Sequence, residues 1–183
     1  MPIQIRPATP ADGAAVAEIY AYYVAETAIT FDETAPTAAE MSQRIADTLA
    51  RYPFLVATDD QQAVIGYAYA SPHRPRASYR WSVDTAIYLD PSHRRLGVGS
   101  ALYARLIPII TAQGYKRAYA GITLPNAASV GLHERLGFKP IGVYSAVGYK
   151  LGQWRDVGWW ELSLTNELPV RPSEPQPWVW KPE

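Results

Sequence analysis

The apolar positions of the chain are spaced in two ways, at every second residue or at every third and fourth. Alternation predicts strands at residues 3–9, 54–58 and 63–70, and the polar "DDQQ" between the last two predicts a hairpin. Helical spacing predicts one helix after Thr9 and another after Thr37. Each of these threonines precedes an acidic residue by three positions, the pattern of a capping box.

The second half of the chain continues the two periods. A long strand is predicted at 79–89, and a glycine-rich turn leads from it into a helix that ends near Gly114. We expect Pro108 to kink that helix, because proline removes one backbone hydrogen bond. The remaining elements are a strand, a short helix and two closing strands, at 116–123, 124–137, 138–152 and 156–164. The order predicts an α/β fold, with a mixed, mostly antiparallel sheet flanked by helices on both faces.

Composition narrows the class of protein. A chain of 183 residues, 48% of them hydrophobic, is long enough for one globular domain. We expect that domain at 1–167, followed by a proline-rich C-terminal arm at 168–183. The 17 basic and 17 acidic side chains balance, which argues against a broad binding surface for nucleic acid or an anionic membrane. The absence of cysteine excludes disulfides, thiolate metal sites and a cysteine nucleophile.

The sequence offers no signal for a membrane or a metal. No apolar run approaches the ~18 residues of a membrane span, and the N-terminal residues lack the apolar segment of a signal peptide. We therefore expect a cytoplasmic protein. His73 and His93 have no partners at metal-ligand spacing, so no metal site is expected.

The segment "HRRLGVGS" stands where the long strand gives way to a helix. The first amides of a helix have no intrahelical partner, and the helix dipole adds positive potential there. Gly97 and Gly99 lack Cβ atoms and would let a pyrophosphate approach the backbone, with Arg94 and Arg95 adding positive charge. The alternative is a glycine-rich turn with two solvated arginines.

Two segments together favour the phosphate site. Arg94-x-x-Gly97-x-Gly99 resembles motif A of the GNAT acetyltransferases, and "LPNAASVGLHERLGF" resembles their motif B. The resemblance implies a fold with splayed central strands, in which free backbone groups of the strand pair with the pantetheine arm of acetyl-CoA and the turn binds its pyrophosphate. The acetyl-CoA-binding residues that it implies are Ile87, Tyr88, Leu89, Arg94, Arg95, Leu96, Gly97, Val98, Gly99, Ser100, Asn126 and Ser129.

Within that superfamily the chain is most similar to the phosphinothricin and methionine sulfoximine N-acetyltransferases. The matching segments include "YRWSVDTAIYLDPSHRRLGVGSALY" and "GQWRDVGWWEL". The resemblance implies direct transfer of acetyl from acetyl-CoA to the α-amine of a glutamate-like or oxidised-methionine analogue. It also implies a homodimer, for which the C-terminal tryptophans and tyrosines are candidate anchors.

Asp84 and His133 are the predicted catalytic residues. Asp84 stands where relatives usually carry glutamate, and its carboxylate could attract the substrate ammonium and accept its proton, directly or through water. His133 stands where many superfamily members carry a tyrosine that protonates coenzyme A, and it shares a helical face with Asn126 and Ser129. The alternatives are a structural hydrogen bond for Asp84 and a partly buried structural role for His133.

Substrate contacts are predicted in two loops. Arg74 and Arg76 could clamp a carboxylate, sulfone or phosphinate oxygen, and Phe31 resembles a segment that covers the substrate. Aromatic side chains could line the pocket, with these candidates: Tyr79, Trp81 and Trp154. A solvated basic loop and an ordinary hydrophobic anchor are the alternatives.

Two other functions remain open from the sequence. The chain could be a protein or peptide N-acetyltransferase, although two arginines suit the free carboxylate that a peptide-linked substrate lacks. It could also be a non-catalytic acyl-CoA-binding module, which the aspartate at position 84 favours and His133 disfavours.

Overall fold

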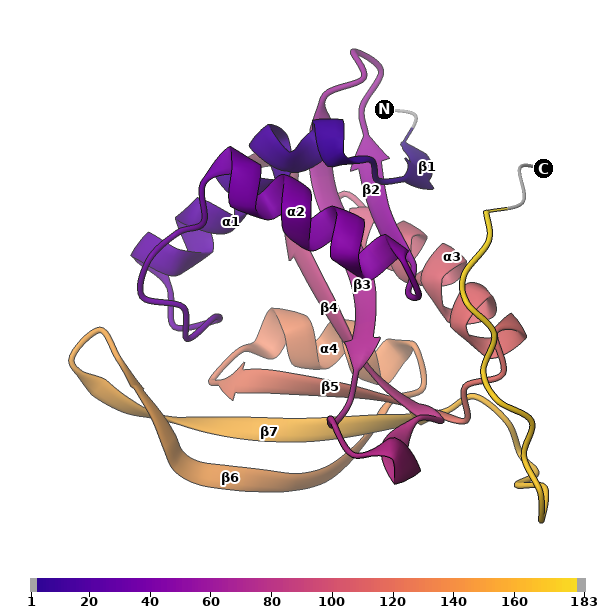
Figure 1. Cartoon of the computed structure of the whole chain (residues 1–183). Coiled ribbons are helices and arrows are strands. Elements are labelled where there is room, and N and C mark those ends of the chain that lie inside the picture. The colour runs from indigo at the N-terminus through magenta and orange to yellow at the C-terminus, as the bar shows by residue number, and fades with distance from the viewer. Residues whose placement is uncertain (1–2, 181–183) are drawn as a thin grey trace.

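The computed structural model describes residues 3–180. They form a single sheet with two helices on each face (Figure 1). The strands are β1 (Gln4–Pro7), β2 (Phe54–Thr58), β3 (Val64–Pro72), β4 (Ser82–Leu89), β5 (Arg117–Leu124), β6 (Lys139–Lys150) and β7 (Gln153–Ser163). The helices are α1 (Gly13–Glu26), α2 (Ala38–Leu49), α3 (Val98–Ala112) and α4 (Ala127–Arg135), with short 3-10 turns η1 (Pro10–Asp12), η2 (Ala77–Tyr79) and η3 (Pro91–His93).

The strands lie in the order β1-β2-β3-β4-β5-β7-β6, and every neighbouring pair is antiparallel except β4 and β5. This confirms the predicted mixed, mostly antiparallel sheet and the predicted order of elements. Several boundaries differ from the predicted ones by one to three residues. The strand expected from Tyr79 begins at Ser82, because the chain first forms the η2 turn at Ala77–Tyr79.

Alternating side chains on each strand supply two hydrophobic cores. On β2, Leu55 and Ala57 join the core under α3, whereas Phe54 and Val56 join the core under α1 and α2. The prediction of helices on both faces is therefore confirmed. α1 and α2 cover the β1–β4 half of their face, and the long β6–β7 hairpin extends beyond them (Figure 1).

The helix boundaries follow their capping chemistry. The Thr37 hydroxyl accepts from the Glu40 amide at 3.2 Å, and the Glu40 carboxylate accepts from the Thr37 amide at 2.7 Å. Helix α3 continues through Pro108 to Ala112, with Gln113 as its C-cap, followed by Gly114 with φ of +98°. Pro108 thus stands inside the helix, and the expected kink stays a prediction.

The central strands splay. β4 pairs with β5 only from Ser82 to Asp84, opposite Arg117 to Tyr119, whereas β5 pairs with β7 along its full length. Beyond Asp84 the two strands diverge, as the resemblance implied. The splay leaves one edge of the second half of β4 without a strand partner.

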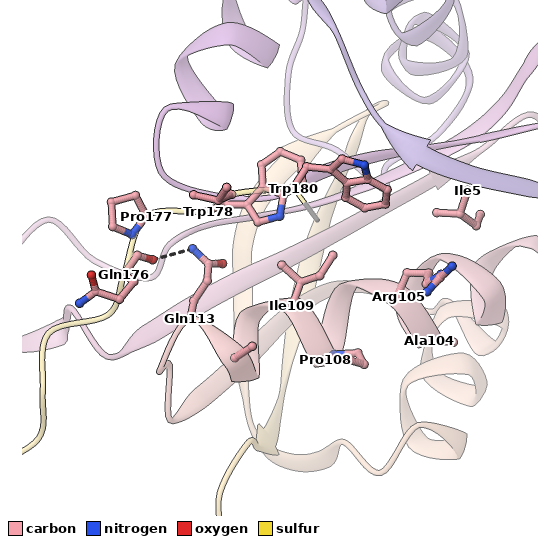
Figure 2. A pocket seen from close by; sticks show the side chains of 12 residues that line it. Ile5, Ala104, Arg105, Pro108, Ile109, Gln113, Gln176, Pro177, Trp178 and Trp180 are labelled. Carbon is pink, nitrogen blue, oxygen red and sulfur yellow. Dashed lines mark hydrogen bonds between the residues drawn. The ribbon is translucent and has the colours of Figure 1, made fainter. Parts of the chain in front are cut away.

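The segment after β7 contains no helix or strand in its described part, and it lies extended against α3 and the loop before β2. The Gln176 amide donates to the Gln113 carbonyl at 2.8 Å, and the Trp178 amide donates to the Arg51 carbonyl at 3.1 Å. Trp178 packs against the core under α3 and does not project outward. Between this segment and α3 lies a groove of about 500 Å³ lined mainly by apolar groups, among them Pro108 and Trp180 (Figure 2).

Residues 3–180 offer neither a membrane-spanning helix nor a cluster of metal-binding side chains. None of the described helices is long and apolar enough to cross a membrane. The same residues contain no cluster of three or more histidine, aspartate or glutamate side chains placed to hold a metal ion.

Candidate active site

Asp84 stands at the point where β4 and β5 separate, since it is the last β4 residue paired with β5. Its neighbour Val83 faces the α3 core, so the Asp84 side chain projects from the opposite face. The Asp84 Oδ1 lies 2.6 Å from Nδ1 of His73, the residue that follows β3. Burial raises the pKa of Asp84, while the hydrogen bond from His73 and the charge of Arg74 oppose that rise.

His73 was not predicted as a functional residue. Its ring stacks on Tyr119 of β5 at 4.3 Å between centroids. The Tyr79 and Trp159 rings are tilted by 67° and 84° to it, with centroids 5.9 and 6.0 Å away. The side chains of His73 and Asp84 are 13% and 28% exposed. The pair is therefore held firmly but is open to solvent.

The basic loop brings one of its two arginines to this cluster. The Arg74 guanidinium lies 5.3 Å above the Trp159 ring and also donates to the His73 carbonyl at 2.7 Å. Arg76 is exposed at the start of η2, and its carbonyl accepts from the Tyr79 amide. The structure thus gathers Arg74 and Tyr79 with Asp84, and leaves Arg76 on the adjacent surface.

The predicted aromatic wall is partly different. Trp81 points toward the C-terminal segment, where its Nε1 donates to the Ser173 carbonyl at 2.8 Å. Trp154 is exposed on the β6–β7 hairpin and packs against Tyr149. The aromatic rings that surround the Asp84 cluster are instead Tyr79, Tyr119 and Trp159, with Tyr144 packed on Trp159 at 5.7 Å.

Phe31 lies in the loop between α1 and α2, and a second unpredicted residue holds it. The Phe31 ring fills the space that a Cβ at Gly148 of β6 would occupy. The buried ammonium of Lys150 donates to the carbonyls of Thr30 and Asp32 at 2.8 and 2.9 Å, one on each side of Phe31. Burial lowers the pKa of Lys150, and the charges of Asp32 and Glu33 oppose that change.

His133 lies on the other face of β4, in the core between α3 and α4. It is 2% exposed. Its Nδ1 donates to the Ser129 carbonyl at 2.8 Å, and its Nε2 lies 2.9 Å from the Tyr103 hydroxyl, which in turn lies 3.1 Å from Oγ1 of Thr85. Burial lowers the pKa of His133. The two predicted catalytic residues therefore lie on opposite faces of the sheet, and His133 has both ring nitrogens bonded within the protein.

The glycine-rich turn has an open backbone. Gly97 has φ of +82°, and a Cβ built on it would meet no atom within 4 Å. The first hydrogen bond of α3 runs from the Ala101 amide to the Gly97 carbonyl at 3.0 Å, so the amides of Val98, Gly99 and Ser100 precede the helical ladder. An anion at this turn would meet backbone donors, and no side chain at Gly97 would stand in its way.

Gly99 has a different role from the one expected. A Cβ there would lie 3.1 Å from Leu132 and 3.4 Å from Ile87, which are packing side chains. The glycine therefore permits α3 to approach β4 and α4, and a larger residue would disturb that packing before it crowded a pyrophosphate. Gly97 is the glycine that faces open space.

The charged and exposed residues of the turn also differ in orientation. The Arg94 guanidinium stacks over the rings of Tyr22 and Tyr23 of α1, at 5.2 and 5.4 Å. Arg95, with φ of +63°, and Leu96 are exposed. The structure thus brings positive charge to the turn while anchoring one arginine on α1.

Backbone groups along the splayed edge of β4 are not equivalent. The Asp90 amide donates to Ile65 of β3, and strand groups alternate in direction, so the groups of Tyr88 also face β3. Those of Ile87 and Leu89 face away from β3, and the Tyr23 hydroxyl hydrogen-bonds both the carbonyl and the amide of Leu89, at 2.5 and 3.2 Å. Of the three residues predicted to pair with the pantetheine arm, Ile87 is therefore the one whose backbone groups face away from β3 and have no hydrogen-bond partner within residues 3–180.

Asn126 and Ser129 lie at the start of α4. The Asn126 side-chain oxygen caps the helix by accepting from the Ser129 amide at 3.1 Å. The Ser129 hydroxyl lies 3.4 Å from Nδ1 of His133. Both side chains therefore make local contacts that fix the beginning of α4.

The comparison with known sequences agrees with this geometry. The sequence model of the acetyltransferase (GNAT) domain matches residues 5–159. The chain belongs to the GNAT acetyltransferase family. This confirms the resemblance that rested on the two motifs, and the acetyltransferase has similar relatives over almost its full length.

Two curated relatives carry related names. The acetyltransferase is 42% identical over 174 residues to phosphinothricin N-acetyltransferase of Streptomyces viridochromogenes, covering 95% of this chain and 94% of that protein. It is 39% identical over 166 residues to the L-methionine sulfoximine/L-methionine sulfone acetyltransferase of Pseudomonas aeruginosa, covering 90% of this chain and 96% of that protein.

A solved structure extends the similarity to three dimensions. The GNAT superfamily phosphinothricin acetyltransferase of Sinorhizobium meliloti, solved in complex with acetyl-CoA, matches with a TM-score of 0.90 and 38% identity. The match covers 95% of each chain.

Proposed function

We propose that this acetyltransferase transfers the acetyl group of acetyl-CoA to the α-amine of a small amino-acid analogue of the phosphinothricin, methionine sulfoximine or methionine sulfone type. The observation that carries the proposal is the position of Asp84. It is a partly buried carboxylate at the last paired residue before the splay, beside Arg74 and three aromatic rings. The names of the two curated relatives support the class of substrate.

The residues present fit acetyl-CoA. Gly97 leaves open space at the start of α3, the amides of Val98 to Ser100 are available to the pyrophosphate, and Ile87 offers free backbone groups to the pantetheine arm. Arg95 adds positive charge beside the turn. Acetyl-CoA would supply the thioester whose carbonyl carbon the amine attacks.

The residues on the substrate side have separate roles in binding the amino acid. The negative charge of Asp84 attracts the substrate ammonium, and Arg74, with Arg76 on the adjacent surface, binds the anionic groups of a free amino acid. Phe31, held by Lys150, covers the substrate from the α1–α2 loop. His133 fixes the relative position of α3, α4 and β4 through Tyr103 and Thr85.

The test is coenzyme A release from acetyl-CoA, followed with a thiol reagent, over phosphinothricin, methionine sulfoximine, methionine sulfone, common amino acids and short peptides. Turnover confined to the free amino-acid analogues is expected, since peptide-linked residues lack the α-carboxylate that the arginines bind. Turnover confined to peptides would replace the proposal with a protein or peptide acetyltransferase. Acetyl-CoA binding without turnover on any compound would favour the non-catalytic module.

We further propose that the chain forms a homodimer through the β6–β7 hairpin. β6 is an edge strand, and large apolar side chains are exposed along the hairpin: Ile141, Val143, Tyr144, Val147, Tyr149, Leu151 and Trp154. Such a patch is typical of protein interfaces. Light scattering at micromolar concentration is expected to give twice the 20.3 kDa chain mass, and Val143→Glu is expected to give the monomer. A monomeric wild-type protein would contradict the proposal.

A further inference from the structure

The His73–Asp84 pair has the geometry of a base and the carboxylate that orients it. We propose that Nε2 of His73 takes the proton from the substrate ammonium, and that Asp84 holds the imidazole in position for this task. The inference rests on the proposed N-acetyl transfer and assigns the proton acceptor within that site. Asp84, which the sequence suggested as the acceptor, then becomes a positioning residue.

The hydrogen bond fixes which nitrogen is available. Because a carboxylate only accepts hydrogen bonds, the 2.6 Å contact to Asp84 requires that Nδ1 of His73 carry the hydrogen. In the neutral ring Nε2 then holds the lone pair. No polar group of residues 3–180 hydrogen-bonds Nε2, and the side chain is 13% exposed, so a substrate amine can approach it.

The surroundings hold the ring still. Tyr119 stacks on one face of the imidazole, and the rings of Tyr79 and Trp159 contact it in T-shaped arrangements. Tyr119 is the residue paired with Asp84 across the β4–β5 boundary, so the ring stands directly beside the splay. Packing and one charge-assisted hydrogen bond together preorganise the nitrogen, which is what proton transfer from a bound amine requires.

Imidazole is also the better acceptor of the two groups. The usual pKa of an imidazole, about 6.5, lies above that of an aspartate carboxyl, about 3.9, and is hence closer to that of an ammonium. Asp84 Oδ1 is already engaged by Nδ1. A carboxylate that stays ionised while it orients and stabilises the imidazolium is the arrangement known from serine hydrolases.

The proton balance is complete with the groups named. The ammonium gives one proton to Nε2 and gains a lone pair, which forms the new N–C bond at the thioester carbonyl carbon. The C–S bond breaks, and the sulfur takes the electron pair and the second proton lost by the nitrogen. The imidazolium returns the first proton to water.

His73→Asn is the matched variant, because the Asn amide nitrogen can take the place of Nδ1 and keep the bond to Asp84 while Nε2 is removed. We expect kcat to fall by about 100-fold, within the range of general base catalysis, with unchanged acetyl-CoA affinity and melting temperature. The acidic limb of the kcat/KM profile is expected to disappear or shift. The charged and titratable groups around the ring are Asp84, Arg74, Tyr79 and Tyr119. The same profile measured in Tyr79→Phe is the control, and this variant is expected to retain the acidic limb.

The double variant shows whether the two residues act as a unit. If Asp84 works through His73, the kcat of His73→Asn/Asp84→Asn is expected to lie within about threefold of the kcat of the slower single variant. If Asp84 is the base and His73 only structural, His73→Asn retains kcat within about threefold and keeps the acidic limb. That result would overturn the inference.

A measurement without turnover separates this inference from the proposed function. The chain has three histidines, so the ¹⁵N spectrum of histidine-labelled protein is simple to assign by substitution. We expect the His73 signal to report the tautomer with hydrogen on Nδ1 and to change in Asp84→Asn. A tautomer with hydrogen on Nε2 would overturn the inference even in an active enzyme. Wild-type protein inactive on every amine, with the expected tautomer, would instead contradict the proposed function.

Discussion

Two histidines flank β4, and their surroundings differ in one decisive respect. His73 and His133 each hydrogen-bond an oxygen through Nδ1, the Asp84 carboxylate for one and the Ser129 carbonyl for the other. His73 keeps Nε2 without a partner among residues 3–180 and is reached by solvent. His133 has its Nε2 beside the Tyr103 hydroxyl and is 2% exposed. The same side chain therefore serves proton transfer on one face and packing on the other.

Exposure and an unused nitrogen are the grounds on which we assign the base to His73 and not to the histidine within a motif. His133 belongs to the recognised motif B segment, yet both its nitrogens serve the junction of α3, α4 and β4. His73 belongs to no motif, yet it lies against the predicted catalytic carboxylate. Substitutions on the two faces should accordingly change different quantities, turnover on the first and stability on the second.

The largest effect is expected from Asp84→Asn. Loss of the charge that attracts the ammonium and orients His73 should lower kcat about 10²–10⁴-fold, while acetyl-CoA affinity stays within about twofold. Burial raises the pKa of Asp84, so the ionised form lowers stability as the pH rises from the unfolded pKa of about 3.9 through the folded value. The variant should therefore be no less stable than wild type at pH 7. Steady-state kinetics and thermal unfolding check both statements, and an unchanged kcat would remove Asp84 from the mechanism.

Tyr103→Phe tests the buried face. It removes the hydroxyl between His133 and Thr85 and leaves Nε2 of His133 buried without that partner. The free energy of unfolding should fall by about 1–3 kcal/mol, while the pH at which kcat/KM is half-maximal stays unchanged. Urea denaturation measures the first and a pH profile the second. A displaced acidic limb would mean that the buried histidine shares in the proton transfer.

Lys150→Met tests the cover on the substrate side. Methionine keeps much of the side-chain volume but loses the two donors to Thr30 and Asp32, so the loop that carries Phe31 should loosen. We expect KM for the amine to rise about tenfold, equivalent to ~1.4 kcal/mol, with acetyl-CoA affinity unchanged. The matched variant Lys150→Arg retains the charge. Equal KM values for wild type and Lys150→Met would show that the loop position does not depend on this clamp.

The smallest effect concerns stability against pH. Burial lowers the pKa of His133, so the unfolded chain binds its proton more tightly than the native state does. The contribution of His133 to the free energy of unfolding is fully present above about pH 6.5. It is lost as the pH falls toward the pKa of the folded state, by up to ~1.4 kcal/mol per pH unit. His133→Gln should flatten that slope between pH 7 and 5 in thermal unfolding. An identical slope in both proteins would contradict the assignment.

The order of elements could be predicted because each strand and helix carries its own period, and the capping threonines mark where helices begin. The position of Asp84 at the splay could be predicted from the resemblance to relatives that carry glutamate there, whereas its catalytic role stays a prediction. The role proposed for His73 could not be predicted, because the length of the loop at 73–81 does not reveal how β3 and β4 pair. In the structure Ser71 lies opposite Asp84, and this pairing brings His73, two residues further on, against the Asp84 side chain. Lys150 was also missed, because it binds backbone carbonyls that are distant in the sequence and leave no residue pattern.

The glycines show a similar limit. Sequence spacing marks both Gly97 and Gly99 as special, but only the packing of Leu132 and Ile87 shows that Gly99 serves helix approach while Gly97 faces open space. Likewise, Tyr23 lies in a predicted helix, and nothing in its spacing indicates that its hydroxyl bonds the Leu89 backbone.

The C-terminal segment is connected to the candidate active site through a short chain of contacts. Its Ser173 carbonyl and Glu174 carboxylate hold Trp81 and Arg80, immediately after the η2 turn whose Tyr79 lies against His73. A label, resin or fusion partner attached at this end would therefore disturb the contacts that hold the loop beside His73. The opposite terminus enters the sheet at β1, the far edge strand, and is the better place to immobilise the protein.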